Sequence, residues 1–274
     1  MRHLLRLTDW TAADVERVFA LADEYEAGRG PRLDGAAVMF FPPSSLRTRV
    51  SFERGAALAG LQPIVFPPES LDKSEALPDV AAYLANWADV AVVRHPNLAV
   101  LESLASADAL PVVNAMTDAN HPCEVLSDLY ALGGGNVAAL AGLRVLFVGA
   151  DGNVGRAWRE AAAVVGLELT QCAPTELGME GVALSPVLDD AVRGAEVIVT
   201  DPPGRHADAL APYRVTAKHL AAAPDGVRLA PCPPFVRGRE VSADAVDHPA
   251  FVGHGFKRSL LPVQQAVMAF CLGA

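Results

Sequence analysis

The sequence predicts an α/β protein with two doubly wound parallel-sheet domains. Short apolar runs of strand length alternate with segments of helical pattern along the chain, and this alternation is typical of parallel sheets covered by helices. It breaks at Gly133-Gly134-Gly135-Asn136 and then starts again. The length of 274 residues fits two domains of roughly 100–200 residues each. We therefore expect a first domain at 1–132 and a second at 133–260.

The first half begins with a helix at 11–22, where Thr11 is the expected N-cap and Asp14 completes a capping box. Buried-type apolar runs then mark four strands. The expected strands are 36–41, 64–66, 90–93 and 111–114, and further helices are expected at 50–59, up to residue 87, and at 125–132.

The second half repeats this order of elements. Its expected strands are 143–148, 167–170, 196–200 and 227–230, with helices at 156–166, from 189 onward and at 263–272. No short-period repeat and no low-complexity segment interrupts the pattern.

Polar side chains follow three strands of the first half. Ser44-Ser45-Leu46-Arg47-Thr48-Arg49 lies between a strand and a helix, Arg94 ends another strand, and His121 follows a third. A helix N-terminus offers free N–H groups, and guanidinium groups match phosphate oxygens. Because ligands of open α/β sheets bind beyond the carboxyl ends of strands, these residues predict a site for a small anion.

The overall composition excludes several classes of protein. A formal net charge of −10 argues against non-specific nucleic-acid binding. The N-terminus lacks the apolar core of a signal peptide, and no apolar run approaches the roughly 18 residues of a membrane span. The four cysteines show neither metal-site spacing nor a disulfide framework. We expect a cytoplasmic protein with no metal and no membrane or nucleic-acid partner.

A glycine-rich turn supports one competing function. Gly149, Gly152 and Gly155 follow a strand and precede a helix, as in a dinucleotide-binding turn of an NAD(P)-dependent oxidoreductase. That turn also requires an acidic residue about 20 positions later. Gln171 stands there instead, and Asp151 places a carboxylate where pyrophosphate would lie. The oxidoreductase therefore remains an alternative rather than the main prediction.

Taken together, the motifs resemble the aspartate/ornithine carbamoyltransferase family over nearly the whole chain. Ser45-Leu46-Arg47-Thr48-Arg49 matches the family's Ser-x-Arg-Thr-Arg motif, with Leu46 in place of Thr. His121-Pro122-Cys123-Glu124 resembles His-Pro-x-Gln, with Glu124 replacing Gln, and residues 89–96 resemble the aspartate branch. Lys73-Ser74-Glu75 resembles the family's Lys-Gly-Glu loop, and Ala230-Pro231-Cys232-Pro233 its Pro-Leu-Pro loop. In this arrangement the C-terminal helix, 261–274, is expected to pack back on the first domain.

The resemblance implies transfer of a carbamoyl group from carbamoyl phosphate to an amine, without a cofactor. It implies that the phosphate is held by Ser45, Leu46, Arg47, Thr48 and Lys73. Arg94 and His121 would bind the carbonyl oxygen, and Glu124 with the Cys232 and Pro233 carbonyls would bind the carbamoyl amino group. The residues expected to be catalytic are Arg47, Arg94, His121 and Glu124.

The acceptor is expected to be an amine other than aspartate. Arg156 matches the residue that binds the α-carboxylate in the aspartate branch, but Asp201 stands where that branch needs Arg for the second carboxylate. The ornithine branch has Asp at this place, and Asn153 resembles its Asp-Gly-Asn run. Ornithine or a similar amine is the main prediction, with Asn153, Arg156 and Asp201 as acceptor-binding residues. An aspartate carbamoyltransferase and a non-catalytic anion-binding relative remain alternatives.

The resemblance also implies an assembly. The family forms trimers with the active site between subunits, and Lys73 lies in the loop that would reach the neighbouring site. We therefore expect a homotrimer whose sites are shared between chains.

Overall fold

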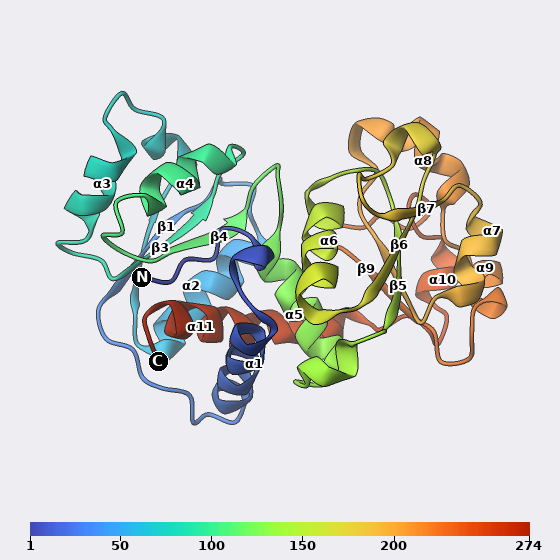
Figure 1. Cartoon of the computed structure of the whole chain (residues 1–274), viewed down its shortest axis with the longest axis horizontal. Helices are drawn as coiled ribbons and strands as arrows, with labels where there is room; N and C mark the ends of the chain where they lie inside the picture. Colours follow the sequence, from blue (N-terminus) through green and yellow to red (C-terminus); the bar gives the residue numbers. More distant parts are fainter. The chain divides into compact units, whose positions relative to one another are not determined.

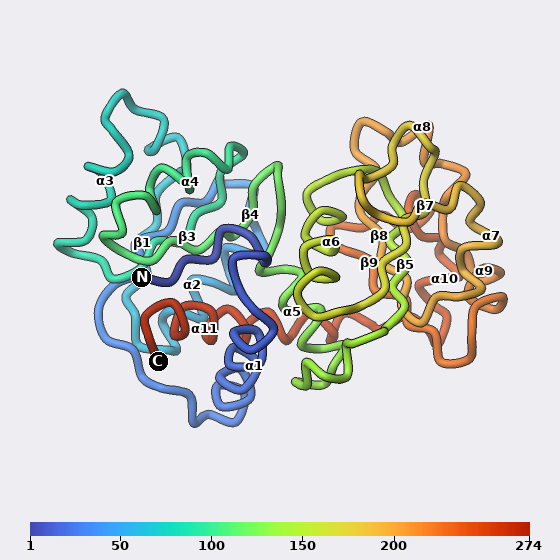
Figure 2. Tube along the Cα trace, in the orientation of Figure 1, coloured from blue at the N-terminus to red at the C-terminus, as the bar shows by residue number.

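The computed structural model describes residues 1–274 and divides into two compact units. Unit 1 contains Met1–Ala138 and Lys257–Ala274, and unit 2 contains Ala139–Phe256. The chain therefore leaves unit 1 once and returns to it near the C-terminus, as the colour sequence of Figures 1 and 2 lets the reader follow. The sequence placed these two crossings at 132/133 and 260/261.

Unit 1 contains a four-stranded parallel sheet in the order β2-β1-β3-β4. Its strands are β1 Ala36–Phe40, β2 Gln62–Phe66, β3 Val90–Arg94 and β4 Val112–Met116. The strand order reverses between β1 and β3, where both strands run parallel with Val38 opposite Ala91. A ligand crevice is expected at such a reversal, beyond the carboxyl ends of the strands.

Helices cover both faces of this sheet (Figure 1). On one face lie α3 Leu77–Leu84 and α4 Leu98–Ala105; on the other lie α2 Arg47–Ala59 and α5 Pro122–Gly133. Alternate strand residues point to opposite faces. Val38, Phe40, Ala91 and Val93 accordingly share one apolar cluster with Leu101 and Leu104 of α4.

The first and last helices of the chain pack together in unit 1. Helix α1, Ala12–Glu26, begins at the predicted capping box, in which Thr11 Oγ1 accepts from the Asp14 N–H. Helix α11, Leu260–Cys271, contacts α1, α2 and α5. All but one of its residues are buried, including the two glutamines Gln264 and Gln265, in this otherwise apolar helix. The predicted return of the C-terminal helix is confirmed.

Unit 2 contains a five-stranded parallel sheet in the order β7-β6-β5-β8-β9. Its strands are β5 Arg144–Val148, β6 Glu168–Cys172, β7 Ala183–Ser185, β8 Val197–Thr200 and β9 Arg228–Pro231. The order reverses between β5 and β8, which gives this unit a crevice of its own. The sequence did not predict β7, because three residues at a sheet edge are too few for a periodic pattern.

The helices of unit 2 again lie on both faces of the sheet. They are α6 Asn153–Val165, α7 Leu188–Ala191, α8 Ala207–Leu210, α9 Ala217–Ala222 and α10 Ala243–Val246. Leu146, Ile198 and Leu229 of the strands pack with residues of α7, α9 and α10 in one buried cluster. The predicted fold class, with two doubly wound parallel sheets, is confirmed.

Short 3-10 helices complete the chain. They are η1 Leu7–Asp9, η2 Pro68–Leu71, η3 Val137–Leu140, η4 Thr175–Leu177, η5 Val192–Gly194, η6 Gly204–His206, η7 Ala211–Tyr213 and η8 His254–Ser259. None of the helices combines the length and the apolar character that crossing a membrane requires.

Candidate active site

The turn between β1 and α2 lies at the strand reversal of unit 1. Ser45 and Thr48 are buried, whereas Leu46 and Arg47 are exposed. Leu46 occupies the N-cap position of α2 and supplies no side-chain cap. The first N–H groups of an α-helix have no partner within the helix. This helix start is therefore open to an anionic ligand, and Arg47 adds a cation beside it.

Arg94 brings a second strand end to the same turn. It is the last residue of β3, and its Nη1 donates to Ser45 Oγ at 3.2 Å. Burial lowers the pKa of Arg94, and the charge of Glu124 opposes this change. A guanidinium retains its charge even when its pKa is somewhat lowered. The structure thus joins two of the predicted site residues directly.

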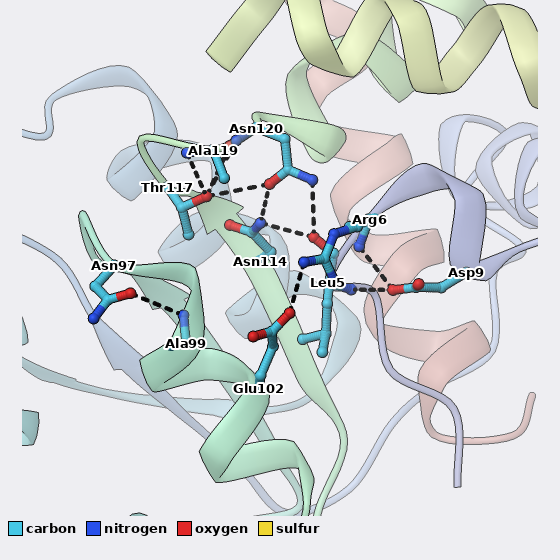
Figure 3. Close-up of polar contacts among 10 residues, drawn as sticks. All are labelled: Leu5, Arg6, Asp9, Asn97, Ala99, Glu102, Asn114, Thr117, Ala119 and Asn120. Carbon is cyan, nitrogen blue, oxygen red and sulfur yellow. Dashed lines mark hydrogen bonds and ion pairs between the residues drawn. The ribbon is translucent and has the colours of Figure 1, made fainter. Parts of the chain in front are cut away.

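His121 is placed at the start of α5 by a buried polar network, which Figure 3 shows. Asn114 in the middle of β4 donates to Asn120 Oδ1 at 2.6 Å and to the Leu5 carbonyl at 2.9 Å. The Asn120 side chain donates to the same carbonyl at 3.1 Å, and Thr117 N–H donates to the Asn120 carbonyl. Hydrogen bonds on several sides hold this loop in one conformation, so the imidazole that follows it is held in place.

The His121 imidazole is neutral near pH 7. Burial is the main cause that lowers its pKa from 6.5 to about 4; Glu124 opposes the change, while Arg94 and Lys257 add to it. The Nδ1 atom is buried and has no hydrogen-bond partner in the chain. A buried polar atom without a partner is uncommon and often belongs to a functional site. A neutral imidazole there can donate a hydrogen bond without adding a charge.

Glu124 belongs to a buried charge cluster that the sequence did not predict. Lys257 of η8 lies with its Nζ 2.7 Å from Glu124 Oε1 and 2.5 Å from Asp128 Oδ1. Burial alone would raise the pKa of Glu124, but the charge and hydrogen bond of Lys257, together with the charge of Arg47, lower it overall. Glu124 is therefore ionised at neutral pH. The available signal was the i, i+4 spacing of two acidic residues on one apolar helix; nothing in the sequence placed Lys257, 133 positions beyond Glu124, against them.

A broad groove of about 1070 Å³ borders the turn and brings two cations not yet named, Arg54 and Arg258. The groove is lined by Arg47, Arg54, Lys257 and Arg258 together with the apolar residues Leu46, Val50 and Leu58. Lys73 is not part of it: this residue lies exposed in the loop between η2 and α3, and its ammonium group meets no acceptor in its own chain. Lys73 therefore does not join the Ser45 turn within one chain.

The predicted acceptor residues gather at the strand reversal of unit 2. Asn153 is the first residue of α6, after β5, and Asp201 follows β8. A Cβ atom placed on Gly152 would lie 3.7 Å from Asp201 Oδ2, so this carboxylate stands against the start of α6. Asp201 also borders a pocket of about 210 Å³ that includes the buried Glu240.

Arg156 is engaged by an acidic neighbour. Its Nε and Nη2 donate to the two carboxylate oxygens of Asp151 at 2.7 and 2.9 Å. This paired contact raises the pKa of Arg156. A substrate carboxylate at this position would have to share or displace Asp151.

The glycine turn and Gln171 both have a structural explanation. Gly155 lies inside α6, where an added Cβ would come within 2.7 Å of the Phe147 ring, so close packing of helix on strand requires glycine. Gln171 is fully buried, and its amide nitrogen donates to the Gly149 and Leu177 carbonyls. Gln171 closes the turn internally and offers nothing to a ribose.

Cys232 and Pro233 follow β9 in unit 2. The Cys232 N–H donates to the Thr200 carbonyl at 2.9 Å, its side chain is buried, and the Pro233–Pro234 peptide bond is cis. This places the segment after Cys232 next to the loop that begins with Asp201.

Comparisons with known proteins bear on the whole chain. Residues 2–133 match the family model described as "Aspartate/ornithine carbamoyltransferase, carbamoyl-P binding domain". An ornithine carbamoyltransferase of Azoarcus sp. (strain BH72) is 30% identical, with 98% of this chain and 95% of that protein covered. One from Desulfotalea psychrophila is 31% identical, with 99% of each chain covered.

Solved structures agree in fold. The ornithine carbamoyltransferase from Burkholderia thailandensis superposes with a TM-score of 0.90 at 25% identity over 100% of this chain and 99% of its own. That from Pyrococcus furiosus gives 0.90 at 26% identity over 100% and 97%. With the motif residues at both strand reversals and matches of this extent, the chain belongs to the aspartate/ornithine carbamoyltransferase family.

Proposed function

We propose that this protein transfers the carbamoyl group of carbamoyl phosphate to the amine of an ornithine-like substrate, giving a ureido product and phosphate. The observation that carries the proposal is that Arg94 contacts Ser45 at the uncapped start of α2 and also interacts electrostatically with His121 at the start of α5. Ser45 follows β1, Arg94 ends β3 and His121 follows β4, three strands of one parallel sheet. The arrangement provides N–H groups, a guanidinium and a neutral imidazole for a small anion.

In this proposal the phosphate lies at the start of α2. The N–H groups of the first turn, the Ser45 and Thr48 hydroxyls and the Arg47 guanidinium supply donors to its oxygens. The phosphate is the leaving group and takes the electron pair of the broken C–O bond, and the attacking amine gives up one proton, which the departing phosphate can accept. Donors fixed before the reaction stabilise the charge that develops on it, without any reorganisation of the protein.

Arg94 and His121 would serve the carbonyl oxygen. When the neutral amine attacks the carbonyl carbon, negative charge develops on this oxygen, and two donors held in place stabilise it. Because the His121 imidazole is neutral, it would donate a hydrogen bond to the oxyanion without adding a positive charge to the site. Glu124, ionised and acceptor-only, suits the NH₂ group of the carbamoyl moiety, as do the carbonyls of Cys232 and Pro233.

The acceptor site would be the crevice of unit 2. Asp201 disfavours a second substrate carboxylate and suits an ammonium group, and Asn153 can contact the amino-acid part. The similar proteins from Azoarcus sp. and D. psychrophila are named ornithine carbamoyltransferases, which supports ornithine or a close analogue. Arg156 would bind the α-carboxylate of the substrate, which would replace the Asp151 carboxylate as its partner.

A panel of amines tests the proposal. The protein is incubated with carbamoyl phosphate and equal concentrations of ornithine, shorter and longer diamino acids and aspartate, and the products are identified by mass spectrometry. A ureido derivative of one diamino acid supports the proposed function. Carbamoyl-aspartate as the main product would identify an aspartate carbamoyltransferase, and binding of carbamoyl phosphate without any product would identify a non-catalytic relative.

We also propose a homotrimer in which Lys73 completes the site of the adjacent chain. The groove beside Arg47 exposes Leu46, Val50 and Leu58 among its cations. The Lys73 loop carries the exposed acidic residues Glu69, Asp72 and Glu75. Two large aromatic residues are exposed nearby in the chain, Tyr83 in α3 and Trp87 in the turn after it. These two surfaces of unit 1 are complementary in charge and in apolar character, and a head-to-tail contact of this kind can close a ring.

Mixing two inactive variants tests the shared site. Lys73→Ala and Arg47→Ala chains are co-refolded, and mixed trimers are verified by native mass spectrometry. If each site uses Arg47 of one chain and Lys73 of the next, about a quarter of the sites in random mixtures are intact. Verified mixed trimers without recovered activity would contradict the sharing of the site between chains.

We further propose a reducing, cytoplasmic location. The four cysteines are free and buried, which is compatible with this proposal.

A further inference from the structure

A lysine near the C-terminal end of the chain lies between two buried carboxylates of α5, next to the candidate active site of unit 1. Glu124 and Asp128 are one turn apart on α5 and are only 5% and 1% exposed. Lys257 reaches both carboxylates with its ammonium group, at 2.7 and 2.5 Å. The hydroxyl groups of Ser127 and Ser259 lie 2.8 Å apart and hold η8 against α5 at the same level.

This arrangement is unfavourable for either carboxylate without the lysine. Removing one partner of a buried ion pair leaves an uncompensated charge in a medium of low polarity. Here two like charges on one helix face share a single cation. Burial accordingly raises the pKa of Asp128 to about 6, whereas the pKa of Glu124 is lowered overall because Lys257 and Arg47 oppose the effect of its burial. Near pH 7 both carboxylates carry charge, and Glu124 is the one whose pKa the cluster keeps below its ordinary value.

An ionised Glu124 has a specific consequence for a carbamoyl ligand. The NH₂ group of this ligand only donates, so both oxygens of a carboxylate suit it. A carboxylate near a bound phosphate, however, repels that phosphate. The cations that face Glu124 are Lys257 from η8, Arg47 from the start of α2 and Arg94 from the end of β3; His121 lies one turn before it and Asp128 one turn after it. Arg47 and Arg94 are assigned to the ligand itself, which leaves Lys257 to compensate Glu124.

We propose that Lys257, clamped by Asp128, is a positioning residue that compensates the charge of Glu124 and so lets a glutamate serve as acceptor beside bound carbamoyl phosphate. The proposal rests on the proposed function, in which Glu124 contacts the carbamoyl amino group. Lys257 acts through Glu124 and is not assigned to the ligand.

The test compares a charge-unbalanced variant with a charge-neutral one. Lys257→Met keeps the length and apolar stem of lysine but leaves two carboxylates without their cation. The triple variant Glu124→Gln, Asp128→Asn, Lys257→Met removes all three charges and keeps an acceptor at position 124. Lys218→Met is the matched control, because Lys218 makes only an exposed ion pair with Asp189 in unit 2. Dissociation constants for carbamoyl phosphate and for inorganic phosphate are measured by calorimetry at pH 6 and pH 8.

The expected result has a signature in pH. At pH 8, where the carboxylates are ionised, Lys257→Met binds carbamoyl phosphate at least about tenfold more weakly than wild type. At pH 6 a proton replaces the lost cation, so the dissociation constants of Lys257→Met and wild type differ by a smaller factor. The triple variant recovers most of the lost affinity, and Lys218→Met binds as wild type does.

Three outcomes are decisive. Equal affinity of Lys257→Met and wild type at both pH values overturns the inference. If Lys257→Met does not fold, the triple variant is compared with wild type instead. An affinity close to that of wild type supports charge compensation. An affinity about tenfold weaker than that of wild type means that Lys257 contacts the ligand itself. If only the proposed function fails, the wild-type protein binds carbamoyl phosphate but converts no amine, and the comparison of dissociation constants still decides the inference. If the wild-type protein does not bind carbamoyl phosphate, both the proposed function and the inference are wrong.

Discussion

The buried groups His121 and Asp128 should change the stability of the protein with pH in opposite directions. His121 is buried and neutral, so below pH 6.5 the unfolded chain binds a proton that the folded chain does not. Stability is therefore lost as pH falls from 6.5 to about 4. At about 1.4 kcal/mol for each tenfold difference in proton affinity, the displacement of the pKa from 6.5 to about 4 is worth about 3 kcal/mol.

Asp128 has the reverse sign. Burial raises its pKa from 3.8 to about 6, so the folded chain binds a proton before the unfolded chain does. Stability is gained as pH falls from 6 to about 4, again by about 3 kcal/mol. The two contributions nearly cancel in wild type, and single substitutions separate them.

Urea unfolding at pH 7, 6, 5 and 4 measures both contributions. Trp87→Phe and Trp158→Phe in the common background leave Trp10, which packs against Phe270 in unit 1, as the fluorescent reporter. As pH falls from 7 to 4, His121→Gln should gain about 3 kcal/mol in its free energy of unfolding relative to the parent, and Asp128→Asn should lose a similar amount. Parallel pH profiles for the parent and His121→Gln would refute the assignment of a neutral, buried imidazole.

Three further outcomes are expected. Arg94→Lys should lower kcat roughly 10²–10³-fold. A single ammonium group cannot both contact Ser45, as the guanidinium does, and reach the oxyanion. Rapid-quench assays measure kcat, and an unchanged value would exclude Arg94 from the oxyanion site. Asp201→Asn should lower kcat/KM for a diamino acid about 10–100-fold and leave the KM for carbamoyl phosphate unchanged, since a charged hydrogen bond contributes roughly 1.5–3 kcal/mol; steady-state kinetics with both substrates decide this. Gly155→Ala should lower the Tm of unit 2, because its Cβ would come within 2.7 Å of the Phe147 ring, and calorimetry showing an unchanged Tm would contradict the close packing.

The fold was predictable because its signals are local. Apolar strands followed by helices define each βαβ unit, and the capping box at Thr11 and Asp14 fixes the first helix from four residues. The short edge strand β7 escaped prediction, since its three residues are stabilised by pairing with β6 and not by a pattern of their own.

The candidate site was predictable only where its residues follow strands. Ser45, Arg94 and His121 could be grouped because the carboxyl ends of parallel strands meet at one edge of the sheet. Lys257 could not, because its contact with Glu124 depends on how the chain returns to unit 1 after the whole of unit 2. Likewise the ion pair between Asp151 and Arg156 depends on side-chain direction at a helix start, which sequence spacing does not specify.

In the proposed function, the site of unit 1 transfers a carbamoyl group to an acceptor that carries a second amine and not a second carboxylate. A competition assay distinguishes these acceptors in one experiment. The protein receives ¹³C-labelled carbamoyl phosphate with ornithine and aspartate at equal concentrations, and the labelled products are separated and quantified. The ratio of the two products is the ratio of the kcat/KM values for the two acceptors. We expect the ureido derivative of ornithine to form in large excess, with one phosphate released for each ureido group. Predominant carbamoyl-aspartate, or phosphate release without any ureido product, would contradict it.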